Sequence, residues 1–189
     1  MSRSFGTLIP IALAGWLAGC TRAAEAQETQ PPPAIVKELF GQPMTEDQVE
    51  AVLERERWVD DGGVMVDFPA HPREVELRVS LFRRGQTELL VASAVVSRLP
   101  SGVPVWRITD AVQMPLVTED DEIGWNCKIG LRGEFVPGLI AMVGSNIAQD
   151  TGESALLGPA RYAWHMDRLT GQLQAEELPV YCNKEDYGV

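Results

Sequence analysis

Residues 75–99 read VELRVSLFRRGQTELLVASAVVSRL, and this stretch decides the fold. Apolar residues fill every second position from Val75 to Leu81, which predicts a half-buried antiparallel strand. Arg84-Gly85-Gln86 predicts a turn, and the segment from Leu89 to Leu99 predicts the returning strand. These residues therefore indicate a β-hairpin within an antiparallel sheet.

Strand patterns continue toward the C-terminus. Residues 123–131 show the clearest alternation, with Ile123, Trp125 and Cys127 on the same face. Leu139 to Val143 is a continuous apolar run, which predicts a central strand buried on both faces. Three further segments have the pattern of strands: residues 103–108, 162–166 and 178–182. A hairpin turn is expected at residues 168–172, between the last two of these strands.

One helix is predicted before these strands. Thr45-Glu46-Asp47-Gln48 has the capping-box pattern, with Thr45 as the N-cap. The predicted helix runs from about Glu46 to Arg57 and buries Val49, Val52 and Leu53. A turn is expected at residues 60–63. Together these elements predict an α+β fold, in which the N-terminal helix packs on an antiparallel β-sheet of about six or seven strands.

The first twenty residues carry a separate signal. A short basic start precedes an apolar stretch from Phe5 to Trp16, which is too short to span a bilayer but suits a signal peptide. The stretch ends in Leu17-Ala18-Gly19-Cys20, which resembles the lipobox of bacterial lipoproteins. An ordinary signal peptide, whose small residues happen to precede a cysteine, is the alternative.

The resemblance implies a processed protein with a lipid anchor. Residues 1–19 would be removed as the signal peptide, and Cys20 would carry the acyl chains, such as palmitate, that hold the protein at the membrane. In Gram-negative lipoproteins an aspartate after this cysteine favours the inner membrane, whereas here the next residue is Thr21. The resemblance thus implies the periplasmic leaflet of the outer membrane. It covers residues 1–20 only.

The rest of the chain divides into a tether and a domain. Residues 20–33 lack apolar periodicity and end in three prolines, which predicts a lipidated cysteine followed by a flexible tether. Residues 34–189 have the length of one globular domain. From Cys20 onward there are 15 basic and 27 acidic side chains, a formal charge of −12. This charge repels nucleic acid and favours a basic protein partner, although it also simply keeps a protein soluble.

Two cysteines remain once Cys20 is assigned to the anchor. An exported compartment is oxidising, and Cys127 and Cys182 both fall on predicted apolar faces, so we expect a disulfide between them. A metal site is the alternative, but two cysteines without a nearby histidine fit it poorly. No metal site and no cofactor is expected.

Few residues suggest catalysis. His71 lies in a loop rich in proline, and His165 shares a strand face with Asp167 without an indicated nucleophile. Gly144-Ser145-Asn146 lacks the flanking glycines of a nucleophile elbow. The acidic run at 119–122 lacks the spacing of a calcium-binding loop, which favours a solvated connection.

Trp106 is the candidate contact for a partner. It alternates with Val105 and Arg107, which predicts a place on the outer face of the sheet, where a tryptophan can anchor a partner. The favoured function is a membrane-anchored periplasmic protein-binding module, for example an inhibitor or immunity protein that meets a basic enzyme. A structural or assembly accessory of the cell envelope is the alternative. A hydrolase ranks third because no nucleophile and base are indicated, so an enzyme is not favoured.

Overall fold

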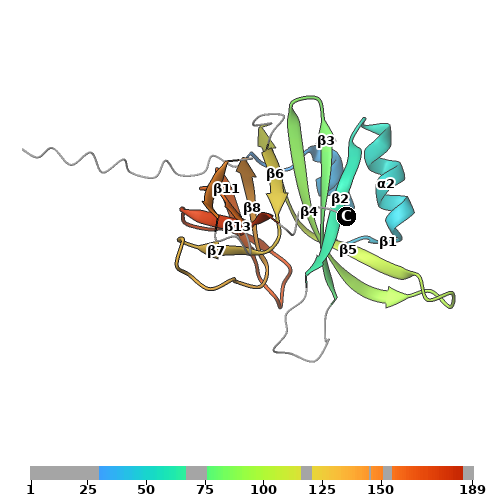
Figure 1. The fold of residues 1–189 in the computed structure, drawn as a ribbon. Coiled ribbons are helices and arrows are strands. Elements are labelled where there is room, and N and C mark those ends of the chain that lie inside the picture. The colour runs from blue at the N-terminus through green and yellow to red at the C-terminus, as the bar shows by residue number, and fades with distance from the viewer. Residues whose placement is uncertain (1–29, 67–75, 116–120, 145, 151–154, 185–189) are drawn as a thin grey trace, which may run out of the picture.

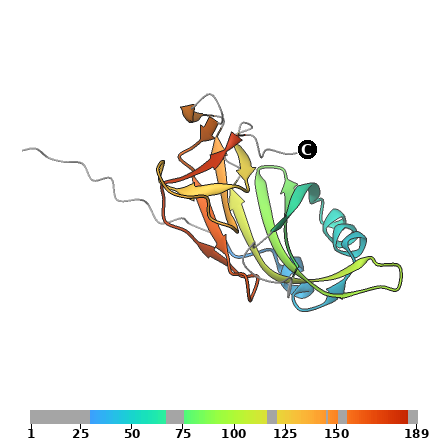
Figure 2. The same cartoon turned by 60° about the horizontal axis from the view of Figure 1, so that its bottom comes forward.

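The structure is a computed structural model that describes residues 30–66, 76–115, 121–144, 146–150 and 155–184. This part of the chain is mostly β: 13 strands form three antiparallel sheets of five, four and four strands, with two short helices beside them (Figure 1, Figure 2). The predicted α+β fold, one helix packed on one sheet of about six or seven strands, is therefore wrong. None of the helices among the described residues is long and apolar enough to cross a membrane.

The hairpin of residues 75–99 lies at the middle of the five-stranded sheet, as β3 and β4. The two strands pair from Leu77–Ala94 to Arg84–Thr87. Gly85 at the turn has a φ of +58°, a conformation that glycine adopts without steric cost. The order of this sheet is β1-β5-β4-β3-β2. Its strands are β1 (Pro43–Met44), β2 (Val59–Val66), β3 (Leu77–Arg84), β4 (Thr87–Arg98) and β5 (Pro104–Pro115).

The other two sheets have four strands each. The central sheet has the order β12-β11-β8-β6 and the outer sheet the order β7-β13-β10-β9. The apolar run at 139–143 is β8, which lies between β6 and β11, and its first five residues are buried as predicted. The strands of the central sheet are β6 (Asp121–Gly124), β8 (Leu139–Gly144), β11 (Tyr162–Met166) and β12 (Leu173–Ala175). Those of the outer sheet are β7 (Cys127–Ile129), β9 (Ile147–Asp150), β10 (Ala155–Leu157) and β13 (Val180–Asn183).

Three apolar cores lie along these layers. The first core joins the five-stranded and central sheets, and the second joins the central and outer sheets. Strand β8 serves both, because Ile140 and Met142 face the first core while Leu139, Ala141 and Val143 face the second. The central sheet thus has two apolar faces, each covered by another sheet. This explains the error in the predicted fold class, since further strands, rather than a helix, bury most of the apolar surface.

The two helices contribute to the third core. Helices α1 (Ala34–Leu39) and α2 (Glu46–Arg55) lie on the face of the five-stranded sheet that points away from the central sheet (Figure 1). They supply only three of its buried residues, namely Val36, Leu39 and Leu53. Trp58 and side chains of β3, β4 and β5 supply the rest.

Two local predictions also need correction. Residues 123–131 do not form one strand, because the chain passes at Trp125 and Asn126 from β6 of the central sheet to β7 of the outer sheet. Residues 60–63 lie inside β2 as a bulge rather than in a turn. Gly63 is needed there, since a Cβ atom at this position would lie 2.7 Å from the carbonyl oxygen of Val79.

The first described residue is already attached to the domain. Gln30 donates its backbone N–H to the carbonyl oxygen of Gln113 on β5, at 3.2 Å. The side-chain amide of Gln113 also donates to Oε1 of Gln30, at 3.1 Å. In the predicted tether, Gln30 therefore lies against the five-stranded sheet, and the residues that follow it lead directly into α1.

Candidate functional site

Helix α2 begins with the capping box that the sequence predicts. The backbone N–H of Thr45 donates to Oε1 of Gln48 at 2.9 Å, and the Thr45 side chain accepts from the backbone N–H of Gln48. These bonds satisfy N–H groups that the start of a helix leaves free. Glu46 and Asp47 occupy the first turn, where the helix dipole favours negative charge. Local sequence thus places acidic side chains at this end of the helix.

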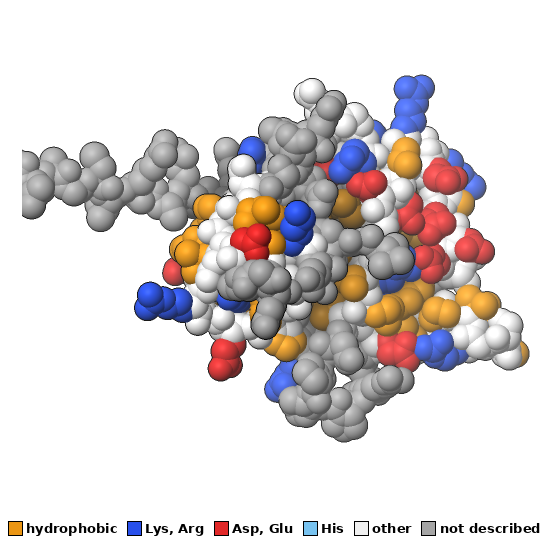
Figure 3. Space-filling view, viewed as in Figure 1, with side chains coloured by type: hydrophobic (Ala, Val, Ile, Leu, Met, Phe, Trp, Pro, Cys, Tyr) orange, Lys and Arg blue, Asp and Glu red, His pale blue; other side chains and the backbone are white. Residues whose placement is uncertain are grey.

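Acidic side chains gather over α2 and β2, on the right-hand side of the molecule in Figure 3. We call this surface the acidic face, and its six members are Glu46, Asp47, Glu50, Glu54, Glu56 and Asp60. Of these, Glu46 pairs with Arg78. The other five make no ion pair within the described residues, and the only basic side chains between residues 46 and 60 are Arg55 and Arg57, so this segment is negative overall.

A half-open cavity lies beneath α2, at the edge of the acidic face. It is enclosed by the N-terminal half of α2 and by the face of β3, β4 and β5 that points toward the helix. Its volume of about 30 Å³ is room for roughly two water molecules. The lining residues are Glu46, Val49, Glu50, Arg78, Ser80, Phe82, Val91, Ser93, Trp106 and Ile108. The lining combines apolar side chains with a few polar groups, and the volume is far below the roughly 300–1,000 Å³ of pockets that hold small molecules.

Trp106 forms part of this lining and is only 6% exposed. The predicted place on the open outer face is therefore wrong. The reason is that Met44 of β1 pairs beside Trp106, and the chain then continues directly into α2, which covers this face of the sheet. The indole Nε1 is buried and has no hydrogen-bond partner. The guanidinium carbon of Arg78 lies 6.0 Å from the centroid of the ring, within the range of a cation–π contact.

Glu50 is the lining residue in the most negative surroundings. Burial raises the pKa of its carboxyl above the ordinary value, and the nearby charges of Asp60, Glu46 and Asp47 raise it further. Arg78 acts in the opposite direction but does not cancel these effects. Because like charges disfavour the ionised carboxylate, a cation placed beside Glu50 would be stabilised.

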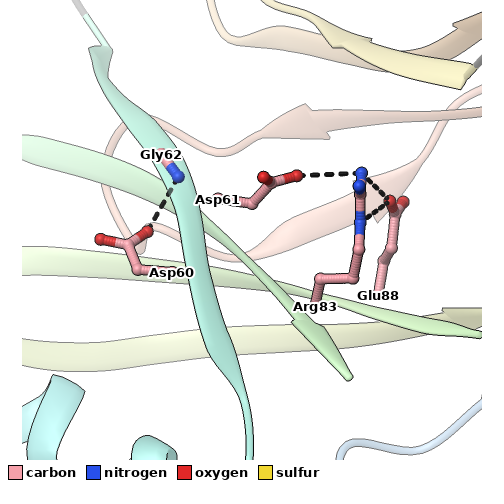
Figure 4. A network of polar contacts seen from close by, with 5 residues as sticks. All are labelled: Asp60, Asp61, Gly62, Arg83 and Glu88. Atoms are coloured by element: carbon pink, nitrogen blue, oxygen red, sulfur yellow. Dashed lines mark hydrogen bonds and ion pairs between the residues drawn. The ribbon is translucent and has the colours of Figure 1, made fainter. Parts of the chain in front are cut away.

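A second polar cluster fastens β2 to the sheet (Figure 4). Arg83 donates through Nε and Nη2 to Oε1 of Glu88, at 3.2 and 2.8 Å, and through Nη2 to the carboxylate of Asp61. Glu88 is 2% exposed, so its charge needs such a cation. Asp60 accepts from the backbone N–H of Gly62 at 2.9 Å within the bulge. These contacts give the cluster a structural role in holding the edge strand.

The predicted disulfide is confirmed. Cys127 of β7 and Cys182 of β13 stand directly opposite each other in the outer sheet, with their Cα atoms 4.0 Å apart. Both side chains are fully buried in the second core. The bridge therefore links two neighbouring strands, and its position in the second core gives it a structural role.

The weaker catalytic candidates do not come together. Oδ1 of Asp167 accepts from the backbone N–H groups of Leu169 and Thr170, and from the Thr170 hydroxyl. These bonds, that from the Thr170 backbone first, lower the pKa of Asp167, while His165 contributes least. Asp167 is thus a turn residue rather than a partner that orients His165. Cys20, His71 and Ser145 lie outside the described residues.

The described residues contain no cluster of three side chains suited to bind a metal. Of the acidic run at 119–122, the structure describes only the backbone of Asp121 and Glu122, in β6. The cavity beneath α2 was not predicted from the sequence, although two residues singled out there, Glu46 and Trp106, line it. No family of known proteins, no curated protein and no solved structure shows a significant match to the chain.

Proposed function

We propose that the protein is a lipoprotein, anchored through Cys20 in the periplasmic leaflet of the outer membrane, whose domain binds a basic protein on the acidic face. The observation that carries this proposal is the set of five acidic side chains without an ion pair beside a partly open cavity. Opposite charge on a partner would speed association and orient it on this face. An inhibitor or immunity protein that meets a basic cell-wall-degrading enzyme is the concrete form.

The fold suits such a role. Helix α2 rests on β3, β4 and β5, and β2 pairs with β3 at the edge of the same sheet, whose other face is packed against a second sheet. The acidic face thus has a well-packed support. Rigid binding surfaces lose little conformational entropy when a partner docks. Asp167, the candidate partner of His165, uses its carboxylate instead to accept hydrogen bonds within the turn at Leu169 and Thr170.

A pull-down from envelope extract tests the proposal. The bait is the mature chain with Cys20→Ala, and it is compared at low salt with the same bait carrying Asp47→Lys and Glu54→Lys. Both residues are exposed and neither lines the cavity. A basic protein that the unchanged bait captures should bind the charge-reversed bait about tenfold more weakly.

The matched control carries Glu134→Lys and Glu177→Lys, which make the same change of charge at exposed positions away from the acidic face. Capture should be unchanged by this pair. Equal loss with both pairs would show a nonspecific effect of net charge and would refute the assignment to the acidic face. Capture of no basic protein by the unchanged bait would refute the proposed function.

A further inference from the structure

Residues 128–135, which begin in β7 and continue beyond it, place three large apolar side chains in solvent at the edge of the outer sheet. Ile129 is 45% exposed, Leu131 is 40% exposed and Phe135 is 42% exposed. We call this segment loop 128–135. Single exposed apolar residues are normal on a folded domain, whereas several within one short segment indicate a contact surface.

The conformation of loop 128–135 is fixed by a tight turn. The backbone N–H of Gly133 donates to the carbonyl oxygen of Gly130 at 3.3 Å, which closes a turn around Leu131 and Arg132. Gly130 has a φ of +68°, and a Cβ atom at Gly133 would collide with the carbonyl oxygen of Ile129, so the turn needs glycine at both positions. The sequence thus presents Leu131 and Arg132 at the tip of a defined turn.

Basic side chains accompany the apolar ones. Lys128 lies opposite Phe135 in an isolated β-bridge, and its Nζ atom is 5.3 Å from the centroid of the phenyl ring. Neither Lys128 nor Arg132 makes an ion pair within the described residues. Glu134 is the one acid of the loop, so two bases and one acid give it a charge of +1, whereas the chain from Cys20 onward carries −12.

Loop 128–135 and the acidic face lie at opposite ends of the molecule. Strand β7 belongs to the outer sheet and α2 covers the five-stranded sheet, with the central sheet between them (Figure 1). Packed sheets are about 10 Å apart, so the two surfaces are separated by more than the Debye length of about 8 Å at physiological ionic strength. The negative charge at one end is therefore largely screened from a partner bound at the other.

Two other exposed turns lack this combination of side chains. The tip of the β4–β5 hairpin, residues 96–103, also exposes three large apolar side chains, but its one basic residue, Arg98, is paired with Glu76. The turn after β11 exposes Arg168 and Leu169, but no other large apolar side chain is exposed in that described turn. Loop 128–135 thus differs from both, because it combines several exposed apolar side chains with unpaired cations.

We propose that loop 128–135 enters the interface of an anionic lipid bilayer and orients the domain on it. The three apolar side chains leave water at the boundary of the acyl chains, and Lys128 and Arg132 meet the phosphate headgroups. A fluid lipid layer accommodates the tip of a turn, whereas a folded protein would have to offer a matching groove. The acidic face then points away from the bilayer, toward a protein partner.

The bilayer lies within reach of the domain. This inference rests on the proposed function, because the bilayer is the one that would hold the acyl chains of Cys20. Gln30, the first described residue, follows Cys20 by ten positions, which span at most about 36 Å of fully extended chain. The anchor would therefore keep the domain close to the lipid surface, where even a weak second contact is favoured.

Co-sedimentation of the mature Cys20→Ala chain with vesicles tests the inference without the anchor. The probes are vesicles of phosphatidylglycerol and phosphatidylcholine in equal parts, and vesicles of phosphatidylcholine alone. The chain should bind the mixed vesicles about fivefold more tightly, because the loop has one excess positive charge, and added salt should release it. Absence of binding to the mixed vesicles would overturn the inference. Equal binding to both kinds of vesicle would overturn the role of the basic side chains.

Matched pairs of variants assign the binding to the loop. Leu131→Asn should weaken binding to the mixed vesicles about tenfold, and Arg132→Gln about fivefold. Leu169→Asn and Arg168→Gln make the same changes in the turn after β11 and should leave binding unchanged. All four side chains are exposed, so the fold should tolerate the changes, and circular dichroism checks this. Equal losses in the two turns would overturn the assignment to loop 128–135.

A gain of binding gives an independent check. Glu134→Lys removes the one acid of the loop and adds a cation, so binding to the mixed vesicles should tighten at least about fivefold. Unchanged or weaker binding by this variant would overturn the charge argument. Vesicle binding without capture of a basic protein would refute only the protein-binding part of the proposed function, and capture without vesicle binding would refute only this inference.

Discussion

Removal of the disulfide between Cys127 and Cys182 should cost the domain a large part of its stability. The two cysteines are 55 residues apart in the sequence. In the chain-entropy model, a bridge over this separation lowers the entropy of the unfolded chain by an amount worth about 4 kcal/mol at 25 °C. For a domain of this size, that corresponds to a fall in melting temperature of roughly 8–16 °C.

Urea unfolding of the mature Cys20→Ala chain measures this effect. The oxidised chain is compared with the same chain in reductant and with the Cys127→Ala, Cys182→Ala double variant. The reduced chain keeps both buried sulfur atoms and loses only the cross-link, so it should be about 4 kcal/mol less stable. The double variant should be somewhat less stable again, because it also leaves a small void in the second core.

One result would contradict the expected loss of stability. Equal urea midpoints for the oxidised and reduced chains, with thiol titration showing that the bridge has opened, would refute the entropic argument. It would mean that β7 and β13 are held together in the unfolded ensemble by other contacts.

Three further predictions concern separate parts of the molecule. Cys20→Ala should release the protein from membranes into the soluble fraction without lowering its melting temperature; membrane association that survives a salt wash would contradict the anchor. Gly63→Ala should destabilise the domain by about 1–3 kcal/mol in urea titrations, because the added methyl group meets the backbone of Val79 at 2.7 Å. The lowered pKa of Asp167 means that its turn contributes stability at pH above the ordinary value of 3.8 and loses it as the pH falls through the folded value. Asp167→Asn should accordingly flatten the acid limb of the stability curve, and an unchanged acid limb would show that the turn bonds contribute nothing.

Features set by neighbouring residues could be predicted from the sequence. The β3–β4 hairpin follows from alternation on either side of Gly85, and α2 follows from the capping box at Thr45. The bridge between Cys127 and Cys182 could also be predicted, since both residues lie on predicted apolar faces and the N-terminal pattern predicts export to an oxidising compartment. The hairpin and the helix are determined by residues that lie within a few positions of one another. The disulfide depends instead on the oxidation of two thiols.

The number of layers could not be predicted in this way. An alternating strand shows that one face is apolar, but it does not say whether a helix or another sheet will cover that face. The alternation from Ile123 to Cys127 even continues where the chain changes sheets. Ile123 belongs to the first core and Cys127 to the second, so one continuous pattern serves two different layers. The predicted single strand and the predicted α+β fold failed for the same reason.

The surroundings of Trp106, the predicted partner contact, could not be predicted for the same reason. Because Trp106 alternates with Val105 and Arg107, its side chain is expected on the other face of the strand. The alternation does not show whether the face that carries Trp106 is open to solvent. Beside Trp106 the face is covered by α2, which begins two residues after its pairing partner Met44. Trp106 lines the cavity at the N-terminal half of α2, and its indole Nε1 is buried. The residue that the sequence indicates as a surface anchor is therefore part of the packing between α2 and the sheet.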